Sequence, residues 1–133
     1  MATKKPAKKA SPRTLTLPDI KKGEVYAGVM VLEGTPANHI ILLPGEATGK
    51  THDQAVAWAK KHKGELPTRR EQALLFASTP EHFKHDYYWS CETHAADAAS
   101  ADYAWRQDFG YGDQISWHKS DKLRARAVRR VVI

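Results

Sequence analysis

The chain has 133 residues, enough for one domain with a hydrophobic core and too few for two ordinary domains. Cys91 is the single cysteine, so these residues can form neither an internal disulfide nor a structural zinc site of cysteines. The formal net charge of +6 is concentrated at one end, because residues 1–13 contain five basic residues and no acid. Residues 14–133 therefore carry a net charge of +1.

The first 13 residues (MATKKPAKKASPR) consist mainly of Lys, Ala, Pro and Ser, which bury too little apolar surface to offset their ordering entropy. We predict a disordered basic tail over residues 1–13 and one domain over residues 14–133. The tail is either a solubilising segment or a tether that makes weak contacts with nucleic acid or another polyanion. We expect no membrane span, since the longest apolar run, residues 27–32, is far too short. The N-terminus does not resemble a secretory signal, so we expect cytoplasmic synthesis.

A β-hairpin is predicted directly after the tail. Residues 24–32 (EVYAGVMVL) are rich in β-branched and aromatic side chains, and residues 38–43 (NHIILL) repeat this pattern after a Gly-Thr-Pro turn. Pro44 and Gly45 end the second strand. Residues 48–50 (TGK) are predicted to continue the loop.

Two helices are predicted next. Thr51 can cap a helix over residues 52–62, which Trp58 would anchor to the core and Gly64 would end. The second helix has a stronger start signal, because Thr68 is followed three residues later by Glu71, as in a capping box. This second helix should end before Pro80.

The remainder of the chain is predicted to form short strands. These cover residues 87–91, 103–109 and 114–118, and one long strand runs from residue 123 to residue 133. Strands at both ends of the chain flank a helical middle, which is typical of an α+β domain.

Four short motifs occur in an order that carries a family resemblance. They are Leu66-Pro67-Thr68-Arg69-Arg70-Glu71, Tyr88-Trp89-Ser90-Cys91-Glu92, Trp105 with Phe109 and Gly110, and Arg124-Ala125-Arg126-Ala127-Val128-Arg129. The segment 64–131 thereby resembles the C-type-lectin-like family typified by the C-terminal domain of a bacterial collagen-like adhesin. This family is common in bacterial and phage proteins.

The resemblance implies a C-type-lectin-like fold in which two helices pack on short antiparallel strands and the N- and C-terminal strands pair. We interpret part of the motif set as residues that hold the fold together, with Trp89 packed against the second helix. This structural set is Leu66, Pro67, Thr68, Glu71, Trp89 and Phe109.

The resemblance also implies that the strands after the second helix present a ligand-binding face. The candidate ligand-binding residues are Tyr103, Trp105, Arg106, Tyr111, Trp117, His118, Arg124 and Arg126. Calcium-dependent sugar binding is not expected, since the paired acid and amide ligands of calcium-binding lectins, Glu-Pro-Asn and Trp-Asn-Asp, are absent from the sequence. We expect no cofactor.

Three signals of other chemistry are weaker than their structural interpretations. His82, His85 and Asp86 could approach one metal ion, but no fourth ligand is in reach. Residues 45–51 (GEATGKT) resemble the end of a phosphate-binding loop, but a proline stands where that signature requires its first glycine. Cys91 is expected to be a small buried residue of a strand. We therefore predict that the chain is not an enzyme.

Two functional hypotheses remain. The first is a recognition module that binds a protein or glycan partner without turnover, such as a phage or prophage structural component of the virion. The second is a nucleic-acid-associated protein that uses the lysine-rich tail and the arginine-rich C-terminal strand. The alternative for these arginines is pairing with acids across the sheet, such as Glu24, Asp108 or Asp113.

Overall fold

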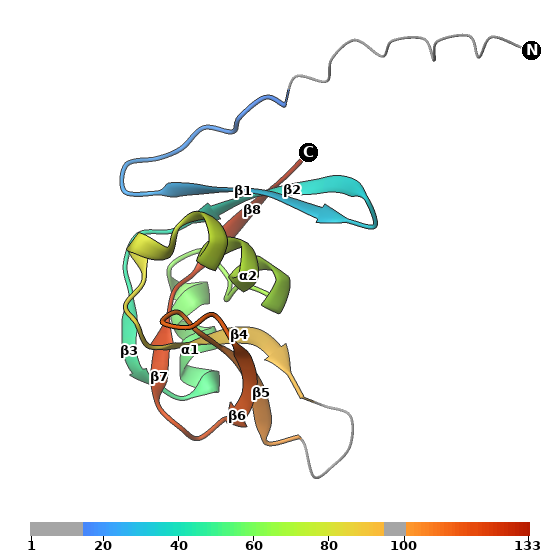
Figure 1. Cartoon of the computed structure of the whole chain (residues 1–133). Helices are drawn as coiled ribbons and strands as arrows, with labels where there is room; N and C mark the ends of the chain where they lie inside the picture. Colours follow the sequence, from blue (N-terminus) through green and yellow to red (C-terminus); the bar gives the residue numbers. More distant parts are fainter. Residues whose placement is uncertain (1–14, 95–100) are drawn as a thin grey trace, which may run out of the picture.

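A computed structural model describes residues 15–94 and 101–133, which form two helices and two β-sheets (Figure 1). The predicted α+β class is confirmed at this level. The predicted tail over residues 1–13 lies outside the described ranges. Neither of the two helices has the length and hydrophobicity that crossing a membrane requires.

The first sheet contains the predicted N-terminal hairpin and the end of the chain. Strands β1 (Val25–Leu32), β2 (Thr35–Leu42) and β8 (Val128–Val132) lie in the order β1-β2-β8, and both pairings are antiparallel. The last strand therefore shares a sheet with the first strand but does not pair with it. The predicted pairing of the terminal strands is wrong in this respect.

The burial of β2 explains this strand order. Ile40 contributes to the main core on one face of the sheet, and its neighbour Ile41 is fully buried on the opposite face. A strand that is apolar on both faces is most stable in the centre of a sheet. The amphipathic β1 and β8 are left as the outer strands.

The second sheet has five strands in the order β3-β7-β4-β5-β6. It comprises β3 (Ala47–Lys50), β4 (Tyr87–Thr93), β5 (Tyr103–Asp108), β6 (Gln114–His118) and β7 (Leu123–Ala125). The pairing of β4 with β7 is parallel, which differs from the purely antiparallel arrangement predicted.

Two sequence predictions are corrected in this sheet. The four residues of β3 were predicted as a loop, but β3 pairs with β7 along the sheet edge. The long C-terminal strand is in fact two strands, because the chain passes from one sheet to the other between Ala125 and Val128. At this crossing the Ala127 carbonyl accepts a hydrogen bond from the Leu43 amide (2.9 Å).

Both predicted helices are present and each begins with a capping box. Helix α1 spans His52–Lys61 after Thr51, and helix α2 spans Arg69–Ser78 after Thr68. In each case the threonine hydroxyl accepts the amide of the residue three positions later, and that residue's side chain accepts the threonine amide. A short 3-10 helix, η1 (Pro80–His82), follows α2.

The end of α1 differs from the prediction that Gly64 stops the helix. Lys63 adopts the left-handed conformation (φ 62°), and the Gly64 amide donates to the Ala59 carbonyl (2.9 Å), which together form a Schellman motif. Gly64 is needed for a different reason. A Cβ atom there would lie 2.5 Å from the side chain of Leu43 and 2.9 Å from the Val128 carbonyl.

The core has two parts, which lie on opposite faces of the five-stranded sheet. Tyr88 packs with α2 and the three-stranded sheet, whereas the adjacent Trp89 packs with α1, because successive side chains of a strand point to opposite faces. The prediction that Trp89 packs against the second helix is therefore wrong. Trp58 is only half-buried, although it contacts this second part of the core as predicted.

His52 connects α1 to this second part of the core. Its ring is buried, lies edge-on to Trp89 (centroids 5.2 Å apart), and its Nε2 lies 2.8 Å from the Ser90 carbonyl oxygen. Because a carbonyl only accepts hydrogen bonds, Nε2 carries the proton. Burial lowers the pKa of His52 below its usual value, so the neutral ring is the form that stabilises the fold.

We expect His52 to make stability depend on pH in the mildly acidic range. The pKa of His52 is lower in the folded state than in the unfolded state, where it is about 6.5. The neutral ring therefore contributes fully to stability above the unfolded pKa, and this contribution is lost as pH falls towards the folded pKa. His52→Gln should lower stability by about 1 kcal/mol at neutral pH and remove this loss, which urea unfolding from about pH 8 to about pH 5 would measure. The exposed His85→Gln control should keep the wild-type profile. An unchanged profile in His52→Gln would contradict a buried neutral imidazole.

Candidate functional site

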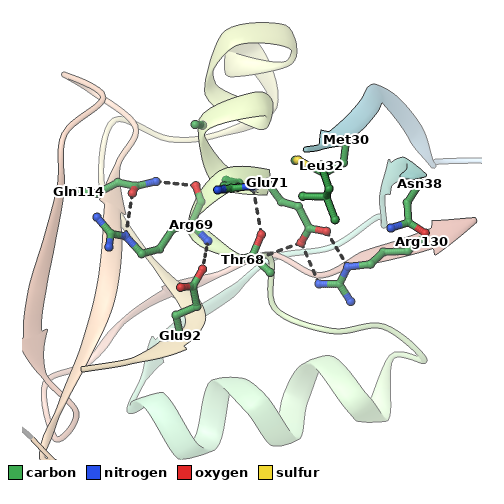
Figure 2. A pocket seen from close by; sticks show the side chains of 11 residues that line it. Met30, Leu32, Asn38, Thr68, Arg69, Glu71, Glu92, Gln114 and Arg130 are labelled. Atoms are coloured by element: carbon green, nitrogen blue, oxygen red, sulfur yellow. Dashed lines mark hydrogen bonds and ion pairs between the residues drawn. The ribbon is translucent and has the colours of Figure 1, made fainter. Parts of the chain in front are cut away.

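A cleft of about 600 Å³ lies between the β1–β2 hairpin and the start of α2 (Figure 2). Met30, Leu32 and Ala73 provide its apolar wall. Its polar wall comes from the first residues of α2, from Glu92 on β4, Gln114 on β6 and Arg130 on β8. This volume is within the range of small-molecule binding sites.

A buried ion pair forms the wall on the β8 side. The Arg130 guanidinium donates to both carboxylate oxygens of Glu71 (2.6 and 2.8 Å), and Glu71 has 4% of its side chain exposed. The same arginine also contacts Glu65, whose side chain is 69% exposed. The hydrogen bond with Glu71 raises the pKa of Arg130, so this pair stays charged.

The opposite wall is built around the backbone and side chain of Arg69. Its amide donates to Glu92 (2.7 Å), and its Nε donates to Gln114 (3.0 Å). Gln114 in turn donates to the Arg69 carbonyl (2.6 Å) (Figure 2). It also donates to buried Gln107 (2.8 Å). These reciprocal bonds hold α2 against β5 and β6 and fix the shape of this end of the cleft.

Two polar side chains of the cleft have no intramolecular partner among the described residues. Arg70 is exposed, and Asn38 is half-buried on β2 beside the apolar wall. They therefore offer a cation and an amide to a ligand without breaking an existing contact. The cleft lining holds three arginines (Arg69, Arg70 and Arg130) and two glutamates (Glu71 and Glu92), so basic side chains outnumber acidic ones.

An aromatic group continues from the cleft along the same face of β5 and β6. The Arg69 guanidinium lies 3.6 Å from the centre of the Trp105 ring, and His94 lies on Trp105 at 5.6 Å between ring centroids. Tyr103 and His118 pair across the strands at 5.4 Å and are both exposed. Of the candidate ligand-binding residues, this face brings together Tyr103, Trp105 and His118.

Arg106 and Trp117, which are also candidate ligand-binding residues, lie on the other face of the sheet from Tyr103. The Arg106 guanidinium stacks on Tyr87 (3.7 Å) and on Trp117 (4.5 Å), and the residue is 6% exposed. Its Nε and Nη1 have no hydrogen-bond partner within the described ranges. Arg106 is thus a packing residue, because alternation along β5 turns it towards the α1 side. Tyr111, at the β5–β6 turn, is 91% exposed and separate from both groups.

The arginines of the C-terminal strands are engaged in intramolecular contacts. Arg124 forms ion pairs with Glu46 (2.8 Å) and Asp86 (2.7 Å). Arg126 donates to two backbone carbonyls, and Arg129 pairs with Glu24 (2.9 Å) as the structural alternative anticipated. Neither Arg124 nor Arg126 is therefore a free donor for a phosphate backbone.

Arg124 is also part of a charged network around Tyr88. The Tyr88 hydroxyl donates to Glu46, the carboxylate that pairs with Arg124. Burial and this hydrogen bond raise the pKa of Tyr88 well above its usual value. The network links the residue before β3, Glu46, to β4 and β7.

The six motif residues interpreted as structural are nearly all inaccessible. Leu66, Trp89 and Phe109 are at most 2% exposed, and Glu71 is 3% exposed. The Trp89 indole also donates to the Lys50 carbonyl (2.9 Å). Thr68 and Glu71 form both the helix cap and part of the cleft wall, so the architectural motif also shapes the candidate site.

Cys91 is exposed, which corrects the expectation of a buried strand cysteine. Partial burial of the thiol nevertheless raises its pKa, which lowers the thiolate fraction at neutral pH. The described residues include no group of three His, Cys, Asp or Glu side chains arranged to bind a metal ion.

Five polar residues that line the cleft were not among the candidate ligand-binding residues: Asn38, Arg69, Arg70, Glu92 and Gln114. In the sequence, Arg69 and Arg70 stood out only as part of a motif. Their position at the predicted N-terminus of the second helix was the one signal that could have placed them at a site. Asn38, Glu92 and Gln114 come from three separate strands. Their proximity depends on the sheet order, which the sequence pattern does not reveal.

Comparison with protein-family models found no match, and a search of curated proteins found no matching chain.

The two acids around Arg130 provide a matched test of the cleft wall. Glu71→Gln should lower the free energy of unfolding by about 3 kcal/mol, because it leaves part of a buried ion pair uncompensated. Glu65→Gln should cost less than about 1 kcal/mol, since this acid is exposed and binds the same arginine. Urea unfolding at neutral pH measures both. Equal losses in the two variants would show that the buried pair is not the main contact of Arg130.

Proposed function

We propose that this chain is a non-enzymatic recognition module that binds a protein or glycan partner in the cleft between the β1–β2 hairpin and α2. The observation that carries the proposal is Arg70, which has no partner within residues 15–94 and 101–133 and lines a hollow of about 600 Å³ that also has an apolar wall. A ligand that places a carboxylate or another anionic group at Arg70 and an apolar part against Leu32 would satisfy both walls.

The rigidity of the cleft supports binding. Glu71, Arg130, Arg69 and Gln114 are all held by hydrogen bonds, so a ligand would meet a preorganised surface. The adjoining Tyr103 and His118 extend this surface along β5 and β6 and can contact a ligand longer than the cleft.

The state of the acids in the cleft supports a role without catalysis. Glu71 is occupied by Arg130 and the helix cap, and Glu92 accepts the Arg69 amide. Both carboxylates are therefore already engaged by donors of the chain itself, and neither is in the free position that a general acid or base needs. The nearby Cys91 thiol has a raised pKa, which disfavours a nucleophilic role.

The C-type-lectin-like assignment remains part of this proposal. It is supported by two helices on mixed short strands, by a terminal strand in the same sheet as the N-terminal hairpin, and by the burial of Leu66, Trp89 and Phe109. In such a module the strands after the second helix would bear the ligand. The cleft adjoins these strands at Glu92 and Gln114.

A charge reversal in the cleft tests the proposal. The full chain would be screened on a panel of neutral and acidic glycans and on a panel of peptides, and the affinity of Arg70→Glu for each hit would then be measured. We expect a loss of roughly tenfold or more, because a charge-assisted hydrogen bond is replaced by repulsion. Arg70 has no described partner, so the variant should fold normally.

Lys60→Glu is the control, since it makes the same charge change on the exposed side of α1, away from the cleft. It should alter the affinity by less than roughly twofold. If no glycan or peptide binds the wild-type chain, or if both variants bind every hit equally, the cleft is not a recognition site of this kind.

A further inference from the structure

An exposed aliphatic patch lies where the start of the described chain meets the end of β8. Leu15 and Leu17 are 44% and 64% exposed, and Val132 and Ile133 are 80% and 46% exposed. The four side chains help to line one hollow, which shares no lining residue with the cleft. We name these four residues the terminal patch.

The segment that carries the two leucines of the terminal patch packs on the three-stranded sheet. Residues 15–20 run along the β1–β2–β8 sheet on the side away from α2 (Figure 1), where the Asp19 carbonyl accepts a hydrogen bond from Arg129 (2.8 Å). Ile41 points to this same side and is fully buried. The exposed leucines are thus held at the surface of the folded domain.

Positive charge adjoins the terminal patch in the sequence. Residues 1–13, which directly precede it, contain four lysines and one arginine and no acid. Lys21 and Lys22 follow the segment and are exposed. Asp19 is the one acidic residue between residue 1 and Lys22. The next acid in the sequence, Glu24, is paired with Arg129.

We propose that the terminal patch docks this protein on the surface of an anionic lipid bilayer. The aliphatic side chains enter the boundary between headgroups and acyl chains, and the basic residues contact the negatively charged headgroups. Neither contribution is strong alone, because few aliphatic side chains or a short basic segment bind a membrane only weakly.

The combination of the two features favours a membrane over other partners. A nucleic acid would attract the basic residues but would leave the exposed leucines unexplained. A second copy of the chain could cover the leucines, but it would bring two segments of charge +5 together. An anionic bilayer complements both the charge and the apolar side chains.

The test is sedimentation of the full chain with vesicles of phosphatidylcholine that contain about 30% phosphatidylserine. We expect the chain to bind these anionic vesicles, with an affinity that falls as the salt concentration rises. Its affinity for vesicles of pure phosphatidylcholine should be roughly tenfold lower. Leu17→Glu combined with Val132→Glu should weaken binding by roughly tenfold or more, since both side chains are exposed and would carry charge into the interface.

The matched control combines Val31→Glu and Tyr111→Glu, which add the same charge at exposed positions outside the terminal patch. This control should bind within roughly twofold of the wild-type chain, and circular dichroism should show that both double variants are folded. The proposal is overturned if the wild-type chain does not sediment with anionic vesicles at low salt. Equal weakening in both double variants also overturns it, because charge alone would then explain the contact.

Discussion

The rest of the described structure depends on the contacts of one buried carboxylate, that of Glu71. It accepts the Thr68 amide at the start of α2 and, through both oxygens, the guanidinium of Arg130 on β8. One buried group thereby joins the helix to the three-stranded sheet. Because an unpaired charge in this position would be costly, the pair also fixes the distance between the β1–β2 hairpin and α2, and hence the width of the cleft.

Alternation along β4 is the second constraint. Tyr88 and Trp89 are adjacent and fully buried, and each belongs to a different part of the core. The five-stranded sheet is therefore covered on both faces, by α2 on one and by α1 on the other. The same alternation on β5 separates Trp105 from Arg106, so these two candidate ligand-binding residues lie on different faces of the sheet.

The basic residues of the chain differ in whether they form intramolecular contacts. The arginines of β7 and β8 form ion pairs or donate to backbone carbonyls, and they act as links between elements. Arg70 in the cleft has no described partner, and the five basic residues of the tail precede the terminal patch. The two proposed contacts, at the cleft and at the terminal patch, therefore use different basic residues.

The amino-acid sequence by itself determined the α+β class, the hairpin, both helix starts and most later strands. These features depend on local rules, such as the capping boxes at Thr51 and Thr68 and the alternation of residues 103–109, which act over a few residues. The tertiary structure alone decided that β8 pairs with β2, that residues 123–133 divide between two sheets, that Trp89 contacts α1, and that Asn38, Glu92 and Gln114 meet beside Arg69. Such contacts join residues far apart in the chain, and they depend on which faces remain to be buried once the local elements have formed.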